Sequence, residues 1–321
     1  MHPLALERLR FMPDTNADPL MCSLPRYERP KEAPPVPAPL TESELISYAD
    51  SETALEASAL SAGGRALLRG LLRLGRSAMF PGGGAGIEYG SLLKTAARPE
   101  YLGAHVQEVA AYLHAQRVDV LVVPGMSGYP VGSMYSFASG IPAVLLKKQR
   151  HADHVAGMTY PPGAFIIPSY TGDGDVLMSA DLAAMQDIVD GILAAQIEAQ
   201  SGADTIHLTV RIAGADDIID KATMSQAVSE SAMIVGQTAI ASFLERYRRA
   251  SGDQRQVVDE VTVVAWVTPL IKGYNRPHEH LHRWFGILPF AGLNVTSVHL
   301  EPAAIGIEGI GIVEFSPPKG N

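Results

Sequence analysis

The sequence predicts an α/β fold with a central, mostly parallel sheet flanked by helices. Short apolar runs rich in β-branched residues, such as 118–123 and 141–146, alternate with helical patterns, as expected for a parallel sheet covered on both faces. Hydrophobic residues make up 47% of the 321 residues and charged residues only 18%, against a typical ~25% charged. The chain can therefore bury a large sheet, which we expect to carry an N-terminal helical region and a C-terminal β-rich extension.

The overall charge and the cysteine content limit the possible partners and location. The formal net charge is -9, which argues against a broad basic face for duplex nucleic acid. Cys22 is the only cysteine, so an internal disulfide is impossible and a reducing compartment fits. The apolar runs are too short for a membrane-spanning helix, and residues 1–14 lack the apolar centre of a signal peptide. We expect a cytoplasmic protein without a membrane partner.

The N-terminal third divides into an arm and a helical region. Closely spaced prolines favour extended backbone, so residues 1–40 are predicted to be a proline-rich arm that acts as a tether or docks a partner. Residues 41–99 are predicted to be a helical region. Thr41–Glu44 has the form of a capping box, and leucines at 67–74 form an apolar stripe typical of a docking helix. We interpret the glycine-rich run 81–86 as a hinge or loop.

Residues 100–267 are predicted to form the α/β core, and residues 268–321 a C-terminal extension with short strands. The expected core strands are 118–123, 141–146, 165–167, 175–178, 205–212 and 261–267. The expected core helices are 102–116, 131–139, 181–200, 222–235 and 238–250. Short strands are expected in the extension at 293–300 and 305–315.

A tight loop at 124–128 follows the first core strand and precedes a helix. In open α/β sheets, ligands bind outside the carboxyl ends of the strands, and a helix N-terminus favours anions. The next strand ends in a cationic patch, so we predict a phosphate or pyrophosphate clamp. The alternative is that these cationic residues are an ordinary solvent-exposed end of the strand. The residues assigned to the clamp are Gly125, Met126, Ser127, Gly128, Lys147, Lys148 and Arg150.

Two further segments carry candidate ligand-binding residues. A predicted strand runs into Asp216 and Asp217, and adjacent acids at a strand end can hold Mg²⁺-bound phosphates or sugar hydroxyls. The alternative is a turn or a helix cap. Gly236, Gln237 and Thr238 open a strongly helical run, where a small loop at a helix N-terminus would cradle a phosphate.

A third candidate site is a histidine cluster near the C-terminus. His278, His280 and His282 alternate with other residues, so on a strand they would lie on one face, as metal ligands do. The alternatives are a surface strand or loop, a subunit contact, or one histidine in a substrate pocket. Because no fourth ligand or supporting shell is evident, we expect no tightly bound transition metal.

Taken in order, the strand–loop–helix, the acid pair and the Gly/Thr segment resemble the type I phosphoribosyltransferase family over residues 100–267. DVLVVPGMSGYPVG corresponds to the family's pyrophosphate-binding element, and LLKKQRH corresponds to the basic end of its next strand. The resemblance implies that segment 152–180 forms a hood-like loop that closes over the site. It also implies that Asp216 and Asp217 precede a threonine-glycine loop that cradles the 5-phosphate.

The chain departs from the family pattern D-D-x-x-x-T-G-x-T directly after the acid pair. Lys221 and Ala222 stand where the threonine and the glycine are expected. The Gly/Thr segment at 236–238 fits the family's loop better. We therefore predict that it binds the 5-phosphate and that residues 218–235 are an insertion over the rim of the site. A helix at 181–200 is a further departure.

The resemblance implies transfer of a ribose 5-phosphate group from phosphoribosyl pyrophosphate to a nitrogenous small-molecule acceptor, with Mg²⁺ as cofactor. Asp216 and Asp217 would be catalytic, holding the ribose hydroxyls directly or through Mg²⁺. We also expect a homodimer. The altered residues at 221–222 support an alternative, a catalytically silent regulatory module that binds phosphoribosyl pyrophosphate or a nucleotide. A third candidate is a metal-dependent hydrolase that uses the histidines at 278–282.

Overall fold

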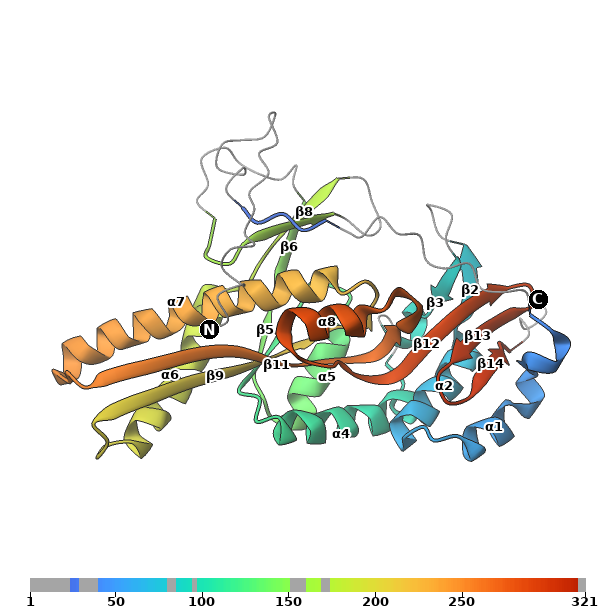
Figure 1. The fold of residues 1–321 in the computed structure, drawn as a ribbon, viewed down its shortest axis with the longest axis horizontal. Coiled ribbons are helices and arrows are strands. Elements are labelled where there is room, and N and C mark those ends of the chain that lie inside the picture. The colour runs from blue at the N-terminus through green and yellow to red at the C-terminus, as the bar shows by residue number, and fades with distance from the viewer. Residues whose placement is uncertain are drawn as a thin grey trace.

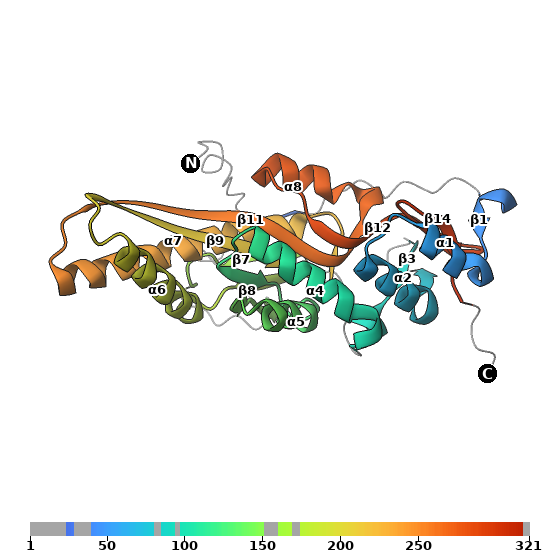
Figure 2. The same cartoon turned by 90° about the horizontal axis from the view of Figure 1, so that it is seen from below.

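The computed structural model describes residues 24–28, 40–79, 85–93, 97–150, 160–168 and 174–316. A long sheet runs through the molecule and carries helices on both faces (Figures 1 and 2). Within the described residues the sheet has nine strands. They are β1 (Leu45–Ile46), β4 (Val120–Val123), β5 (Ala143–Leu145), β9 (Thr205–Ala215), β10 (Ile218–Ile219), β11 (Gln256–Lys272), β12 (Phe290–Leu300), β13 (Ala303–Ile307) and β14 (Gly311–Glu314).

The strands β5, β4, β9, β11 and β12 lie side by side in this order and are parallel. The prediction of a mostly parallel sheet is therefore confirmed. β13 and β14 continue the sheet as antiparallel strands, and β1 pairs with β14. The chain passes from β4 to its neighbour β5 on one side and then crosses to β9 on the other side. Such a switch point leaves a crevice outside the carboxyl ends of the two strands, where ligands bind in open α/β sheets.

The border expected between the core and the C-terminal extension, at residue 267, falls inside β11. The first part of this strand pairs with β9, and its last part pairs with both β10 and β12. The strands of the extension therefore belong to the same sheet as the core.

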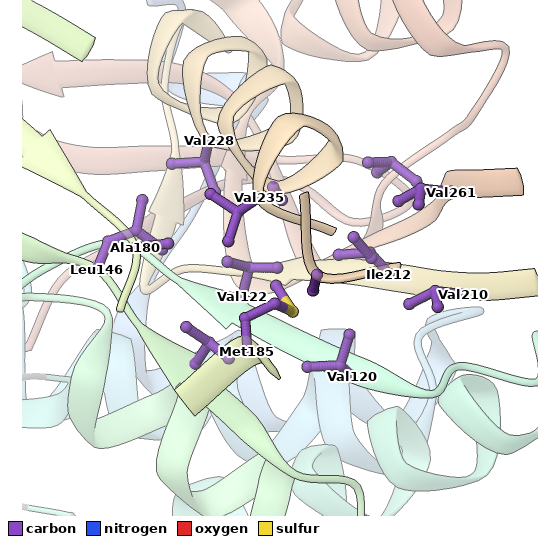
Figure 3. Close-up of a cluster of buried hydrophobic side chains, with 14 of the residues drawn as sticks. Val120, Val122, Leu146, Ala180, Met185, Val210, Ile212, Val228, Val235 and Val261 are labelled. Atoms are coloured by element: carbon purple, nitrogen blue, oxygen red, sulfur yellow. The ribbon is translucent and has the colours of Figure 1, made fainter. Parts of the chain in front are cut away.

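Helices cover both faces of the sheet, which explains why the central strands are continuously apolar. Alternate residues of a strand point to opposite faces. Val120 and Val122 of β4 pack in the cluster with α6 and α7 (Figure 3), whereas Leu121 and Val123 pack with α4 and α5. Each of these four side chains is at most 1% exposed, and burying each contributes about 1.5–3 kcal/mol. The helices are α1 (Ser51–Ala57), α2 (Ala62–Leu74), α3 (Gly90–Leu93), α4 (Pro99–Ala115), α5 (Tyr129–Ser139), α6 (Leu182–Ala199), α7 (Thr223–Ser251) and α8 (Pro277–Phe285).

α7 has 29 residues and, by length and composition alone, is apolar enough to cross a membrane. However, 56% of its most apolar 18-residue window is buried inside the protein. Its buried side packs on β9 and β11. The apolar character of α7 is therefore that of a helix covering a sheet.

The N-terminal region is only partly helical. α1 and α2 form within the expected stretch, but β1 and a hairpin of β2 (Arg76–Met79) and β3 (Ala85–Glu88) interrupt it. The capping box at Thr41–Glu44 is present, yet it caps a three-residue 3-10 turn instead of a long helix. The leucines of α2 pack against β12, β13 and β14, as expected for a docking helix. Most of the glycine-rich run 81–86 lies outside the described residues.

A small antiparallel sheet follows β5 and stands beside the main sheet (Figure 1). It consists of β6 (Lys147–Arg150), β8 (Asp175–Ser179) and β7 (Phe165–Pro168), in that spatial order. Within the segment 152–180, which was expected to form a hood, residues 160–168 and 174–180 are described, and they contain β7 and β8.

Residues 24–28, part of the proline-rich arm, run along β7. Ile166 donates its backbone N–H to the carbonyl of Pro25 at 2.9 Å, and Tyr27 donates its own to the carbonyl of Ile166 at 3.0 Å. The hydroxyl of Tyr27 donates to the carboxylate of Glu230 on α7. This short segment therefore ties the small sheet to α7, and the other arm residues up to 39 lie outside the described part.

β9 extends well beyond β4, so the outer edge of its first half is not paired with any described strand. Two glutamines of α6 complete this edge instead. The side-chain amide of Gln200 donates to the carbonyl of His207 at 2.8 Å and accepts its N–H at 2.9 Å. Gln196 makes the same pair of bonds with Thr209, also at 2.8 and 2.9 Å. Side chains thus cover a strand edge that could otherwise pair with another chain.

Candidate functional site

The acid pair lies at the carboxyl end of β9, where the strand is interrupted. β9 ends at Ala215, and β10 resumes pairing with β11 directly after the two acids. The backbone N–H of Asp216 donates to the carbonyl of Val267 at 3.2 Å. Asp216 and Asp217 are 8% and 2% exposed. Both carboxylates are therefore fixed between two paired segments of strand and are largely shielded from water.

The loop 124–128 meets the acid pair at the switch point between β4 and β9. A Cβ atom added to Gly128 would lie 2.8 Å from Oδ1 of Asp216, so the loop backbone and the carboxylate are close neighbours. α5 begins at the next residue, and within the described part of the chain no side chain caps it. The N–H groups of its first turn can therefore bind a ligand, and the helix dipole favours an anion there.

The two lysines of the predicted clamp have different surroundings. Nζ of Lys147 lies 2.9 Å from Oδ2 of Asp181 and lowers the pKa of that carboxyl by hydrogen bonding. Lys148 lies against the loop, since a Cβ atom added to Gly125 would be 3.3 Å from its Cβ. Both lysines are exposed. The side chain of Arg150 lies outside the described part of the structure.

The prediction of a phosphate cradle at Gly236, Gln237 and Thr238 is wrong. α7 is one continuous helix, so these residues lie in its interior, where backbone N–H groups bond to carbonyls of the preceding turn. Gly236 packs closely on the sheet: a Cβ atom added to it would lie 2.9 Å from Cγ1 of Val261. A glycine costs a helix interior only about 1 kcal/mol, which this close packing offsets.

The predicted insertion of residues 218–235 is also wrong. Residues 218–222 alone separate the acid pair from Thr223, the first residue of α7. Ala222 has a φ of +59°, a left-handed conformation that costs a residue other than glycine about 1–2 kcal/mol. This is the position at which the resembled pattern carries glycine. Reading the pattern without a gap therefore places its glycine at this left-handed residue.

The histidine cluster lies on a helix, so the alternate spacing that would place the three histidines on one face of a strand does not do so here. Pro277 begins α8, and proline is well suited to the first position of a helix. His280 turns to Trp284 and stacks on it with the ring centres 5.3 Å apart. Among the residues the structure describes, no group of three or more His, Cys, Asp or Glu side chains could hold a metal ion. The hydrolase candidate therefore loses the geometry on which it depended.

Two fully buried polar side chains lie behind the acid pair. His105 of α4 and Tyr135 of α5 are both 0% exposed, and Nε2 of His105 lies 2.9 Å from the hydroxyl oxygen of Tyr135. Burial lowers the pKa of His105 to about 4, against a smaller opposing effect of the Thr268 backbone. Burial, and then the negative charge of Asp217, raises the pKa of Tyr135. Neither residue stands out in the sequence, because a single histidine and a single tyrosine on helices form no motif.

Comparisons with known proteins place the chain near one group of solved structures. No family model matches the sequence, and no curated protein matches it. The adenine phosphoribosyltransferase from Leishmania donovani is 16% identical, with 80% of this chain and 86% of that chain covered and a TM-score of 0.42. The enzyme from Rhodothermus marinus is 14% identical, with 76% and 99% covered and a TM-score of 0.42. The Trypanosoma brucei enzyme, solved with AMP, pyrophosphate and ribose-5-phosphate, is 12% identical, with 71% and 78% covered and a TM-score of 0.42. Likeness at this level assigns neither an activity nor an acceptor to this chain.

Proposed function

We propose that this protein transfers a ribose 5-phosphate group from phosphoribosyl pyrophosphate to a nitrogenous acceptor. The observation that carries the proposal is the contact between Gly128 and Asp216 across the switch point. It joins an uncapped helix N-terminus, which suits a pyrophosphate, to a fixed pair of carboxylates, which suits ribose hydroxyls. One phosphorylated sugar can therefore span both halves of the crevice.

The acid pair also fits a magnesium ion that arrives with the substrate. Carboxylate oxygens are preferred ligands of Mg²⁺, which usually binds through one or two carboxylates together with substrate phosphates. Asp216 and Asp217 would hold the ion directly or through the ribose hydroxyls, and the bound ion would neutralise pyrophosphate charge.

In the proposed reaction the bond between the ribose C1 and the pyrophosphate oxygen breaks, and a bond between C1 and the acceptor nitrogen forms. The electron pair leaves with pyrophosphate. The loop N–H groups, the start of α5 and Lys148 would stabilise the charge that develops there. Asp216 and Asp217 would stabilise the positive charge of the oxocarbenium-like sugar. We place the 5-phosphate at the N-terminus of α7, after Ala222, where helix N–H groups begin.

Calorimetric titration with phosphoribosyl pyrophosphate and Mg²⁺ tests the binding step. Pyrophosphate release with a panel of nitrogenous bases then tests the transfer step. We expect both. Binding without release for any base would favour the silent regulatory module, and absence of binding would overturn the proposal.

The silent module is favoured by one observation. Lys221 and Ala222 replace the threonine and the glycine of the resembled pattern, and Ala222 is held in a left-handed conformation. The strain of that residue costs about 1–2 kcal/mol. A phosphate at this turn would therefore be bound by backbone N–H groups and Lys221, without the threonine hydroxyl of the resembled pattern. Ala222→Gly relieves the strain and separates the candidates: it raises turnover in an enzyme and changes binding alone in a module.

Lys148→Ala is expected to weaken binding of phosphoribosyl pyrophosphate by about 1–3 kcal/mol, as for loss of a charge-assisted contact. Lys147→Ala is the matched control, because Lys147 neighbours it in sequence and is also exposed, but its ammonium is engaged with Asp181. Calorimetric titration at low salt measures the affinity of both variants for phosphoribosyl pyrophosphate. Equal weakening by the two substitutions would show that strand charge in general, and not the position of Lys148, is responsible.

Gly128→Ala is expected to disturb the site while the fold stays intact. The added methyl group would lie 2.8 Å from Oδ1 of Asp216 and 3.0 Å from the carbonyl oxygen of Pro124, so the carboxylate or the loop has to move. Overpacking costs roughly 1–3 kcal/mol, and a cost of this size borne by the binding conformation corresponds to an about 5- to 150-fold loss of substrate affinity. In Gly103→Ala the methyl group meets no atom within 4 Å. This control should keep its affinity, and a similar loss in both variants would contradict the proposed geometry.

A further inference from the structure

The turn that joins β10 to α7 is held from one side by the end of β11 and the loop after it. Ile219 of β10 pairs with Ile271 of β11 in parallel register. Asp220, directly after β10, and Lys272, the last residue of β11, therefore lie side by side, and Nζ of Lys272 is 3.2 Å from Oδ2 of Asp220. Asn275, in the 3-10 turn that follows, donates its side-chain amide to Oδ1 of the same carboxylate. Both oxygens of Asp220 are thus bound from β11 and its loop.

Lys272 is 6% exposed, so its ammonium is almost fully removed from water. Burying a charge costs free energy, and pairing it with one carboxylate often repays no more than this cost. Leu270 and Ile271, the residues before it on β11, are buried and apolar. A further apolar side chain would fill such a place without burying a charge. The ion pair therefore indicates a need for a fixed Asp220 carboxylate more than a need for stability.

The turn that carries Asp220 ends in a conformation that is locally disfavoured. Ala222 is the N-cap residue of α7 and has a φ of +59°, which costs free energy in a residue other than glycine. Such a conformation persists only where the surrounding structure enforces it. Within the described part of the chain no side chain caps α7, so its first N–H groups can bind a ligand. The backbone of this turn sets their direction.

We propose that Lys272 and Asn275 are positioning residues for the 5-phosphate: they hold Asp220, and through it the turn at 218–222, so that the first N–H groups of α7 point at the phosphate. This inference rests on the placement of the 5-phosphate in the proposed function. Groups that are ordered before the ligand arrives bind it more tightly, because binding then does not have to order them. The pyrophosphate is assigned to the loop at 124–128, so the two phosphate sites have different supports.

Lys272→Met removes the ammonium and keeps an unbranched side chain. We expect the affinity for ribose 5-phosphate to fall about tenfold or more, as for loss of one hydrogen bond to a charged group, while the affinity for pyrophosphate stays unchanged. Asn275→Ala removes the other donor and leaves the ion pair in place, so it keeps the test open if Lys272→Met does not fold. It should show the same selective loss. Calorimetric titration of the full chain with each ligand and Mg²⁺ measures both affinities.

Arg255→Met is the matched control. Arg255 forms another largely shielded ion pair, with Asp253 at 2.6 Å, beyond the C-terminal end of α7. Its loss should lower stability and leave both affinities unchanged. Hydrogen exchange of the backbone at 218–224 gives a readout without any ligand. Exchange there should be faster in Lys272→Met and Asn275→Ala, and as slow as in wild type in Arg255→Met.

The outcomes separate this inference from the proposed function. The inference is overturned if the folded variants keep their affinity for ribose 5-phosphate, if they lose both ligands equally, or if exchange at 218–224 is unchanged. It is also overturned if wild type does not bind ribose 5-phosphate. If the selective loss is found but no base releases pyrophosphate from phosphoribosyl pyrophosphate, the proposed function fails and the role of Lys272 and Asn275 stands. If transfer occurs without the selective loss, the function stands and the inference fails.

Discussion

Asp217→Asn is expected to lower the turnover of phosphoribosyl transfer by about 10²–10³-fold, as does the loss of a preorganised electrostatic group in other active sites. Asparagine keeps the shape of aspartate and removes its charge. Because Asp217 is 2% exposed, water screens this charge weakly, so its attraction for a developing positive sugar is strong. The affinity for phosphoribosyl pyrophosphate should fall much less than the turnover, since the sugar carries no positive charge before the reaction begins.

Single-turnover kinetics together with calorimetric titration separate these two effects. Asp187→Asn is the control, because Asp187 is an exposed acid on α6 and its loss changes the net charge by the same amount. It should leave both turnover and affinity unchanged. A large loss of affinity with unchanged turnover in Asp217→Asn would show that the acid binds the ground state and does not assist the reaction.

Gly214→Ala is expected to destabilise the fold by about 3 kcal/mol, at the upper end of the range for overpacking. The ring of Trp266 lies directly over this glycine on the neighbouring strand, and an added Cβ would be 2.2 Å from its Cε2. Trp266 cannot move aside easily, since it is 0% exposed and its indole N–H donates to Ser229 at 2.9 Å. Urea unfolding measures the change in the free energy of unfolding.

A second substitution distinguishes this clash from a general defect of the strand. Trp266→Phe removes the fused ring that occupies the space, so the double variant should lose less stability than the two single losses added together. Gly191→Ala, at a position on α6 where the methyl group meets no atom within 4 Å, should instead stabilise the protein by about 0.5–1 kcal/mol. Additive losses in the double variant would contradict the proposed clash.

The central strands could be predicted from the sequence because they are buried on both faces and are therefore continuously apolar. β4 follows from this property, and so does the loop between β4 and α5. The first part of β9 alternates between buried and less buried residues, which is itself a strand pattern. Parallel strands end at a common edge, which also made the position of Asp216 and Asp217 predictable.

The two errors in the predicted sites, at Gly236 and at the histidine cluster, both came from reading a local pattern inside a helix as a sign of another structure. Gly236 was read as part of a loop that opens a helix, but a glycine inside a helix is tolerated where the backbone must approach a sheet closely. At α8 the alternating histidines suggested a strand. The better signals were Pro277 at the first helical position and Gly286, with a φ of +71°, just after the last.

Other features depend on contacts between residues far apart in the chain, which no local pattern encodes. His105 and Tyr135 meet because α4 and α5 pack side by side on one face of the sheet. The short segment at 24–28 pairs with β7 more than a hundred residues away. Such contacts follow from the topology of the whole fold.

The glutamines that cover the edge of β9 make this part of the molecule sensitive to chemical ageing. Hydrolysis of a glutamine amide leaves a glutamate, whose ionised side chain only accepts hydrogen bonds. At Gln196 the new oxygen would face the carbonyl of Thr209, where the amide nitrogen now donates at 2.8 Å. Two acceptors would then repel each other, and α6 would release the strand edge. Mass spectrometry of stored protein, read beside its oligomer content, detects this change. Deamidation at one side chain would thus convert a closed edge into a site of self-association, in a molecule whose fold is otherwise undamaged.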